Sequence, residues 1–183
     1  AGNAVLAAGT GTQSVIRADG TTVIQLNTPR ALQINTSTSA RAITISGYDY
    51  FGQSMTETIT VSVAGTPVNG KKAFFQITGI TISGGTTGAI TVGTTDILGA
   101  PVRFNNKGYI SRCGWNDVLA EDAATVVDAD ATTATTTTGD VRGTVTPSSA
   151  CDGAKRLVVG ILLTGIQCGP NATRAGALGV TQA

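Results

Sequence analysis

Two runs of alternating apolar and polar residues constrain the fold of this chain more than any other feature of its sequence. The first is Ile43–Tyr48. The second is Met55–Val63, where even-numbered positions are Thr or Ser and odd-numbered positions are apolar except for Glu57. Because successive side chains of a strand point to opposite faces, both runs predict half-buried β-strands. Between them, Gly52 can supply the positive φ that a bulged hairpin turn requires.

Two more strand-like runs follow, Phe75–Ser83 and Ala89–Gly93, with a glycine-rich turn at 84–88 between them. Consecutive strands joined by short turns are usually neighbours in a sheet. The segment from Arg41 to Arg103 therefore predicts a β-meander.

Glu57 is the one acidic residue in the apolar phase of its strand. Because a charged side chain is rarely buried without a partner, we expect this part of the strand to lie at the sheet rim with Glu57 in solvent. A buried ion pair with Arg41 or Arg103 is the alternative.

Shorter patterns extend the β prediction along the chain. Asp19-Gly20 favours a type I′ hairpin turn between Ser14–Arg17 and Thr21–Leu26. Pro29 then breaks pairing before a further strand at Ala31–Asn35, with Leu32 and Ile34 inward. Two later runs also read as strands: Tyr109–Cys113 and Asp140–Val145. Roughly ten to twelve short strands predict an all-β, antiparallel sandwich or barrel.

The run Lys155–Gln167 differs from the others because both of its faces are apolar. Leu157, Val159, Ile161 and Leu163 fall on one face, and Val158 and Leu162 on the other. Such strands are typically covered on both faces. We therefore expect this strand at the centre of a sheet.

The segment Asp130–Gly139 is rich in threonine and has no apolar face, so it predicts an exposed loop or an extended edge strand. Asp128, Asp130 and Thr132 have the oxygen spacing of the first half of a calcium loop. The glycine and the glutamate that complete such a loop are missing, so we expect a solvated loop.

Three parts of the chain are expected from composition and periodicity. They are a flexible N-terminal arm at 1–13, a single β-sandwich domain at 14–168, and an extended C-terminal tail at 169–183.

The sequence contains no histidine, and charged residues make up 13% of it, about half of the usual ~25%. Without histidine, Ser-His-Asp and Cys-His catalysis and imidazole-ligated metals are excluded. We expect no enzymatic activity, no cofactor and no metal site.

The longest basic run is Lys71-Lys72, so nucleic acid is not an expected partner. A membrane is not expected either, since no apolar stretch approaches ~20 residues.

Three widely spaced cysteines, Cys113, Cys151 and Cys168, form no Cys-x-x-Cys pair. We expect reduced thiols, with a single disulfide as the alternative.

Trp115 is the only tryptophan, and we expect it to anchor the core or a subunit interface, with ligand stacking as the alternative. Exposed aromatic residues and the threonine-lined face of the 55–63 strand are further candidate contact surfaces. The candidate interface residues are Trp115, Tyr48, Tyr50, Phe51, Thr56, Thr58 and Thr60.

Five segments of the chain resemble one protein family. They are RAITISGYDYFGQSMTETITV (41–61), VNGKKAFFQITGITISG (68–84), VGTTDILGAPVR (92–103), TTGDVRGTVTPSSACDGAKRLVV (137–159) and GPNATRAGALGVTQA (169–183). The signatures Gly-Lys-Lys (70–72) and Gly-Asp-Val-Arg-Gly (139–143) contribute most to the likeness. The chain is thereby similar to capsid decoration, or cement, proteins of short-tailed bacteriophages, which are encoded beside the major capsid protein.

The resemblance implies a jelly-roll-like β-sandwich that is made in the host cytoplasm and lies on the capsid exterior of the virion. It would act as a homodimer or homotrimer that bridges adjacent major capsid protein subunits and stabilises the DNA-filled head. Two other functions stay open. One is a head or tail fibre module that binds a host surface glycan, and the other is a tail-tube or connector component.

Overall fold

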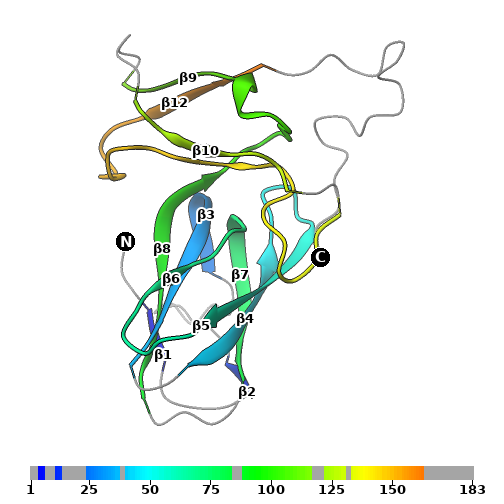
Figure 1. Cartoon of the computed structure of the whole chain (residues 1–183), viewed down its shortest axis with the longest axis vertical. Helices are drawn as coiled ribbons and strands as arrows, with labels where there is room; N and C mark the ends of the chain where they lie inside the picture. The colour runs from blue at the N-terminus through cyan, green and yellow to red at the C-terminus, as the bar shows by residue number, and fades with distance from the viewer. Residues whose placement is uncertain are drawn as a thin grey trace.

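The computed structural model describes residues 4–6, 11–13, 24–37, 40–83, 88–116, 122–130 and 133–162. These residues form strands and one short 3-10 helix, η1 (Lys107–Tyr109) (Figure 1). In chain order the strands are β1 (Ala4–Leu6), β2 (Gly11–Gln13), β3 (Ile24–Thr36), β4 (Arg41–Tyr48), β5 (Ser54–Val61), β6 (Val68–Asn69), β7 (Phe74–Ile82), β8 (Ile90–Gly99), β9 (Ile110–Trp115), β10 (Thr125–Val127), β11 (Thr144–Thr146) and β12 (Leu157–Ile161).

The larger sheet is antiparallel and has the strand order β10-β11-β8-β3-β7-β4-β5, with β1 on β8, β2 on β7 and β6 on β3. The hairpin β4–β5 is confirmed, but the predicted meander is wrong beyond it. β7 pairs with β4, and β3 lies between β7 and β8. The reason is the length of β3, whose first half pairs with β7 and whose second half pairs with β8.

Pro29 does not end its strand as predicted. β3 continues through it, and the pairing with β7 shifts register between Gln25 and Arg30. A proline lacks the N–H that a ladder needs, so it is accommodated at this irregularity. Leu32 and Ile34 are buried, as predicted. The hairpin predicted around Asp19-Gly20 lies outside the described residues.

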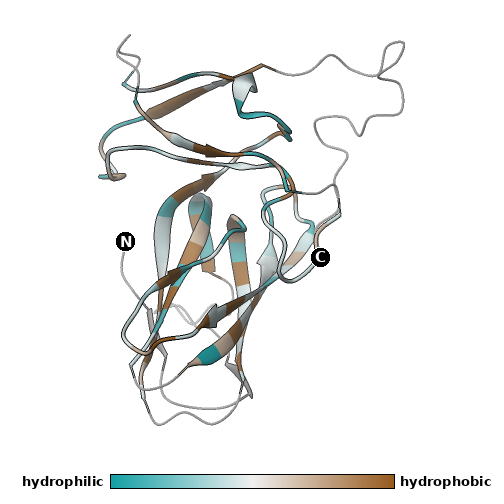
Figure 2. Cartoon of the chain, viewed as in Figure 1, coloured by the Kyte–Doolittle hydropathy of each residue, from teal (hydrophilic) through white to brown (hydrophobic). Residues whose placement is uncertain are grey.

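The inward side chains of the curled sheet form the main core. The alternation predicted for β4 and β5 is confirmed, because Ile43, Ile45, Met55 and Ile59 are all buried. Val63, predicted on the same face, is instead 62% exposed because it lies beyond the end of β5. β5 also packs against β3 and β6, so the sheet closes around this core (Figure 2).

A second, smaller core holds the ladder β9–β12 against the other sheet. Phe104, Cys113 and Val145 are its buried residues, and Leu157 and Val159 of β12 pack against them. The ladder lies at one end of the molecule, beside β10 and β11 (Figure 1). The prediction of an all-β, antiparallel sandwich is thereby confirmed, while its jelly-roll form stays a prediction.

β12 is not the central strand that its two apolar faces predicted. Within the part of the chain that the structure describes, it pairs with β9 alone, and each of its residues is only half-buried. The apolar residues of β12 predict that other parts of the protein cover its two faces. They do not predict how many strands pair with its edges, because that depends on the tertiary structure.

The two ends of the chain are described only in part. Within the segment 1–13, β1 pairs with β8 and β2 with β7; the flexibility of this segment stays a prediction. The tail at 169–183 lies outside the described residues.

The described part of the threonine-rich segment, 133–139, is a loop with one isolated bridge residue, Thr133, and it lies along the edge of β5. Ala134 is buried, and the carbonyl of Thr136 accepts a hydrogen bond from the N–H of Thr58 at 2.7 Å. The carboxylate of Asp130 accepts the N–H of Gly139 at 2.6 Å. The segment therefore protects a sheet edge that would otherwise expose unpaired backbone groups.

Replacing Ile45 by alanine removes a fully buried side chain from the main core. We expect the free energy of unfolding to fall by about 2–5 kcal/mol, since the cavity can collapse only in part. Denaturant titration measures this loss. Thr60→Ala, on the exposed face of the same hairpin, is the control and should change stability by no more than about 0.5 kcal/mol. Equal effects of the two substitutions would contradict the assignment of the faces.

Candidate interface at the turn between strands β4 and β5

Three aromatic side chains, Tyr50, Phe51 and Phe75, contact one another at the turn between β4 and β5, and with Tyr48, which ends β4, we call them the aromatic patch. Tyr48, Tyr50 and Phe51 are 39%, 56% and 46% exposed. Tyr50 contacts Phe51 and Phe75 edge to face, with ring centroids 5.4 and 5.2 Å apart. Exposed large hydrophobic residues that cluster in this way are typical of interaction sites.

The turn under the patch is held by the side chain of Asp49. Its Oδ1 accepts the backbone N–H groups of Phe51 and Gln53 at 2.8 and 2.9 Å. Gly52 has a φ of +78°, as the turn requires. An aspartate that binds its own turn in this way lowers the number of conformations open to it.

Arg142 binds this turn through a buried ion pair with Asp49. Its Nη1 lies 2.6 Å from Oδ2 of Asp49, and both side chains are less than 5% exposed. The guanidinium carbon also lies 4.8 Å from the centroid of the Phe51 ring, within cation–π range. One arginine therefore positions both the turn and one ring of the aromatic patch.

The two sequence signatures meet beneath the turn. Asp140, of the signature at 139–143, accepts the N–H of Ala73 at 3.0 Å through one oxygen and that of Arg142 at 2.8 Å through the other. Ala73 directly follows the signature at 70–72. A carboxylate buried among backbone N–H donors satisfies groups that would otherwise be costly to bury. The signatures are thus structural, and they join three distant parts of the chain.

Glu57 is buried, contrary to the prediction that it lies in solvent at the sheet rim. Its partners are the backbone N–H groups of Lys71 and Lys72, at 2.6 and 3.4 Å, rather than Arg41 or Arg103. The alternation continues through the strand, and the closure of the sheet brings the 70–73 segment against this face. The carboxylate supplies acceptors where no neighbouring strand does.

Glycines of both signatures stand where a side chain would collide. A Cβ at Gly70 would lie 2.6 Å from Oε2 of Glu57. Gly143 has a φ of +96°, and a Cβ there would lie 2.5 Å from the ring of Phe104. Gly70 is needed because the Glu57 side chain approaches its backbone closely. Gly143 is needed because its φ is positive and because the Phe104 ring leaves no room for a Cβ.

Burial governs the protonation of this network. It raises the pKa of Glu57 and of Asp140 above their ordinary values, although backbone N–H donors oppose the rise. Burial also lowers the pKa of Lys72, against the attraction of Glu57. The ammonium of Lys72 donates to the carbonyl of Thr56 at 2.8 Å. The carboxylates serve as acceptors for the backbone.

Beside the aromatic patch, the outer face of β4, β5 and β7 carries hydroxyl and other uncharged side chains. Thr56 and Thr58 are half-buried and Thr60 is exposed. The hydroxyl of Thr58 contacts that of Thr44 at 3.0 Å across the hairpin. The register places these residues on one face: Ala42, Thr44, Ser46, Tyr48, Ser54, Thr56, Thr58, Thr60, Gln76, Gly79 and Thr81. We call this set the hydroxyl face, and Tyr48 belongs to both surfaces.

Trp115 is not brought to the aromatic patch. It ends β9 and is half-buried, and its Nε1 donates to Oδ2 of Asp122 at 2.9 Å. Ser148 donates to the same carboxylate through its N–H, at 2.6 Å, and its hydroxyl, at 2.8 Å. These hydrogen bonds hold the pKa of Asp122 below its ordinary value, and the bond from the Ser148 backbone N–H contributes most.

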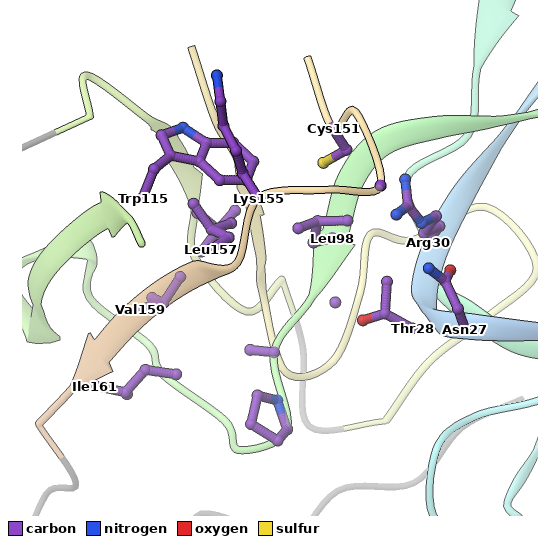
Figure 3. A pocket seen from close by; sticks show the side chains of 15 residues that line it. Asn27, Thr28, Arg30, Leu98, Trp115, Cys151, Lys155, Leu157, Val159 and Ile161 are labelled. Atoms are coloured by element: carbon purple, nitrogen blue, oxygen red, sulfur yellow. The ribbon is translucent and has the colours of Figure 1, made fainter. Parts of the chain in front are cut away.

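Trp115 lines a cleft of about 410 Å³ between β12 on one side and β3 and β8 on the other (Figure 3). Arg30 lies on the β3 side and is paired with Asp96 at 3.2 Å. Lys155 also lines the cleft, and its side chain is 54% exposed. The candidate interface residues are therefore divided between two places, the β4–β5 hairpin and this cleft.

Two of the three cysteines lie within the described residues. Cys113 and Cys151 are free thiols, and Cys168 lies outside the described residues. Among the described residues, no three His, Cys, Asp or Glu side chains gather as metal ligands. No helix in the described part of the chain is both long and apolar enough to cross a membrane.

Sequence patterns missed Phe75, Asp49 and Arg142 as parts of the site. Asp49 could have been found, because an aspartate three residues before a glycine is a common turn signal. The position of Arg142 had no local signal, since its partner lies far away in the sequence.

Comparisons with known proteins identify no family for this chain. No family model, no curated protein and no solved structure matches it.

Replacing Arg142 by methionine leaves the buried carboxylate of Asp49 without its cation. We expect the free energy of unfolding to fall by about 3–5 kcal/mol, as is usual when one partner of a buried pair is removed. Chemical denaturation measures it. Lys155→Met is the control, because its pair with Asp152 is exposed and should leave stability nearly unchanged. A small loss in R142M would show that the pair does not secure the turn.

The raised pKa values of Glu57 and Asp140 predict a pH dependence of stability. Between the ordinary and the raised values, the native state binds more protons than the unfolded state. The free energy of unfolding should therefore fall as pH rises through this window. Denaturant titrations across the acidic range give the slope. Glu57→Gln cannot titrate and should have a shallower slope; an unchanged slope would exclude Glu57 as its source.

Proposed function

We propose that this chain is a virion structural protein that binds the outer capsid shell and bridges adjacent major capsid protein subunits. The observation that supports this best is the exposed aromatic patch on a hydrogen-bonded turn, beside the uncharged hydroxyl face with which it shares Tyr48. The resemblance of segments such as 68–84 and 137–159 to phage decoration proteins favours the same role. Such a protein would lie on the capsid exterior and stabilise the DNA-filled head.

The hydrogen-bonded turn makes the aromatic patch suitable for binding. Association costs free energy for every side chain and loop that it orders. Here Asp49 and Arg142 already order the turn in the unbound chain. Aromatic residues with few rotatable bonds are frequent hot spots of protein interfaces. Tyr50 and Phe51 are therefore the anchors that we assign to the capsid contact.

The hydroxyl face suits a broad contact around these anchors. Its side chains are neutral and mostly small, so a partner can cover them without removing ions from water. Their hydroxyl groups can donate and accept hydrogen bonds at the rim.

We assign a structural rather than a catalytic role. The three buried carboxylates of Asp49, Glu57 and Asp140 each accept hydrogen bonds that hold the chain together. A pair of carboxylates acting on a substrate would instead need to face a common cleft.

A second candidate is a head or tail fibre module that binds a host surface glycan. The exposure of Tyr50 and Phe51 favours it, because exposed aromatic rings can stack on the apolar faces of sugar rings. The same residues serve both proposals, so the partner must be identified by experiment.

The test mixes the purified protein with virions or capsids that lack it and measures occupancy by sedimentation. Occupied particles should retain their DNA to a higher temperature than bare ones. Replacing Tyr50 and Phe51 together by alanine should weaken binding at least roughly tenfold, since both anchors are lost.

The matched control is Val63→Ala, which removes another exposed apolar side chain beyond the opposite end of β5. It should leave occupancy unchanged. Failure of the unmodified protein to bind particles would sink the capsid proposal. Binding to host cells that the double variant loses would establish the glycan alternative in its place.

A further inference from the structure

β12 is more apolar than its place at a ladder edge requires. Leu157–Ile161 are all half-buried, and Leu162 just beyond them is 57% exposed. In Figure 2 the strand is hydrophobic along most of its length. Native proteins usually protect such edges with charges, prolines or covering segments.

The hydrogen bonds of β12 show which backbone groups face its free edge. The carbonyl of Arg156 accepts the N–H of Asn116 at 2.8 Å, and the N–H of Leu162 donates to the carbonyl of Tyr109 at 2.7 Å. The carbonyl of Gly160 accepts from the hydroxyl of Ser111 at 3.1 Å. Even-numbered residues of β12 therefore face β9.

In an antiparallel strand this direction alternates from residue to residue. The N–H and C=O groups of Leu157, Val159 and Ile161 consequently point away from β9. In the described part of the chain, no strand pairs with that edge. The side chains of these three residues line the cleft, on the face of β12 that is turned toward β3 and β8 (Figure 3).

We propose that two copies of the chain pair through the free edges of β12, antiparallel and about a two-fold axis at Val159. The result is a continuous four-stranded sheet in the order β9-β12-β12-β9, where β12 of each copy becomes a central strand. Its two apolar faces, which predicted a central strand, are then explained.

The sequence of β12 is complementary to itself in this register. Val159 meets its own counterpart, Leu157 meets Ile161, and Val158 meets Gly160. Directly opposed apolar pairs stabilise a sheet, whereas opposed like charges destabilise it. Arg156 falls opposite Leu162, so no two cations are opposed. The three residues that face the edge would form roughly six hydrogen bonds between copies, two for each opposed pair.

Self-complementarity is the reason to assign the edge to a second copy. A two-fold interface uses the same patch on both subunits, and this strand meets that requirement residue by residue. The inference does not depend on the capsid proposal. If both hold, a dimer carries two aromatic patches and can bind two capsid subunits at once, which raises its overall affinity.

Sedimentation of the purified protein and amide exchange followed by NMR test the proposal. The protein should sediment as a dimer. The amides of Leu157, Val159 and Ile161 should be as protected as those of Val158, Gly160 and Leu162, which face β9 and serve as internal controls. This measurement uses the unmodified protein and so does not depend on the folding of any variant.

Val159→Pro removes the N–H at the two-fold axis but no bond to β9, and proline is tolerated where the N–H faces outward on an edge strand. We expect the dimer dissociation constant to rise at least about tenfold, because two symmetric bonds are lost. Val159→Thr keeps the N–H and the branched shape. Its dimer dissociation constant should stay within a few-fold of that of the original protein. Fluorescence of Trp115, which pairs with Leu157, reports whether the ladder stays folded.

Three results would overturn the proposal. The first is a monomer whose odd-numbered amides exchange freely. The second is a monomer whose odd-numbered amides are protected, which would mean that another segment of the same chain covers the edge. The third is a dimer that V159P does not weaken, because its interface would lie elsewhere.

Discussion

Three buried carboxylates are the constraint on which the rest of this structure depends. Asp49, Glu57 and Asp140 lie in the interior, where an unsatisfied charge costs several kcal/mol. Each is surrounded by backbone N–H groups, and Arg142 or Lys72 supplies a nearby positive charge. These contacts tie the β4–β5 turn to the 70–73 and 140–143 segments. They hold these three parts of the chain together where the sheet closes.

The same network prepares the surface that we assign to binding. A turn held by Asp49 and Arg142 presents Tyr50 and Phe51 without further ordering, which is the main cost that a flexible loop would meet. The neighbouring hydroxyl face also lowers the cost of binding, because its side chains carry no charge that must be removed from water. The free edge of β12 lies apart from this surface, on the ladder at one end of the molecule (Figure 1). Self-association and partner binding therefore use different elements, so one need not obstruct the other.

Local patterns predicted the β-strands and much of their orientation, but only part of the candidate site. Alternation placed Ile43 and Met55 inward and Thr60 outward, because side-chain direction in a strand depends on the local backbone alone. Tyr50 and Phe51 come together because one short turn holds both. Trp115 lies elsewhere, since β9 belongs to the second ladder.

The sequence by itself determined that the chain is β-structured, which side chains share a face, and where the β4–β5 hairpin turns. These properties follow from period-two geometry and from glycine at a positive φ. Only the tertiary structure decided that β3 separates β7 from β8, that Glu57 is buried and that β12 lies at an edge. Each of these depends on contacts between residues distant in sequence. Whether a charge can be buried is decided by the donors that folding brings to it, and no local pattern records them.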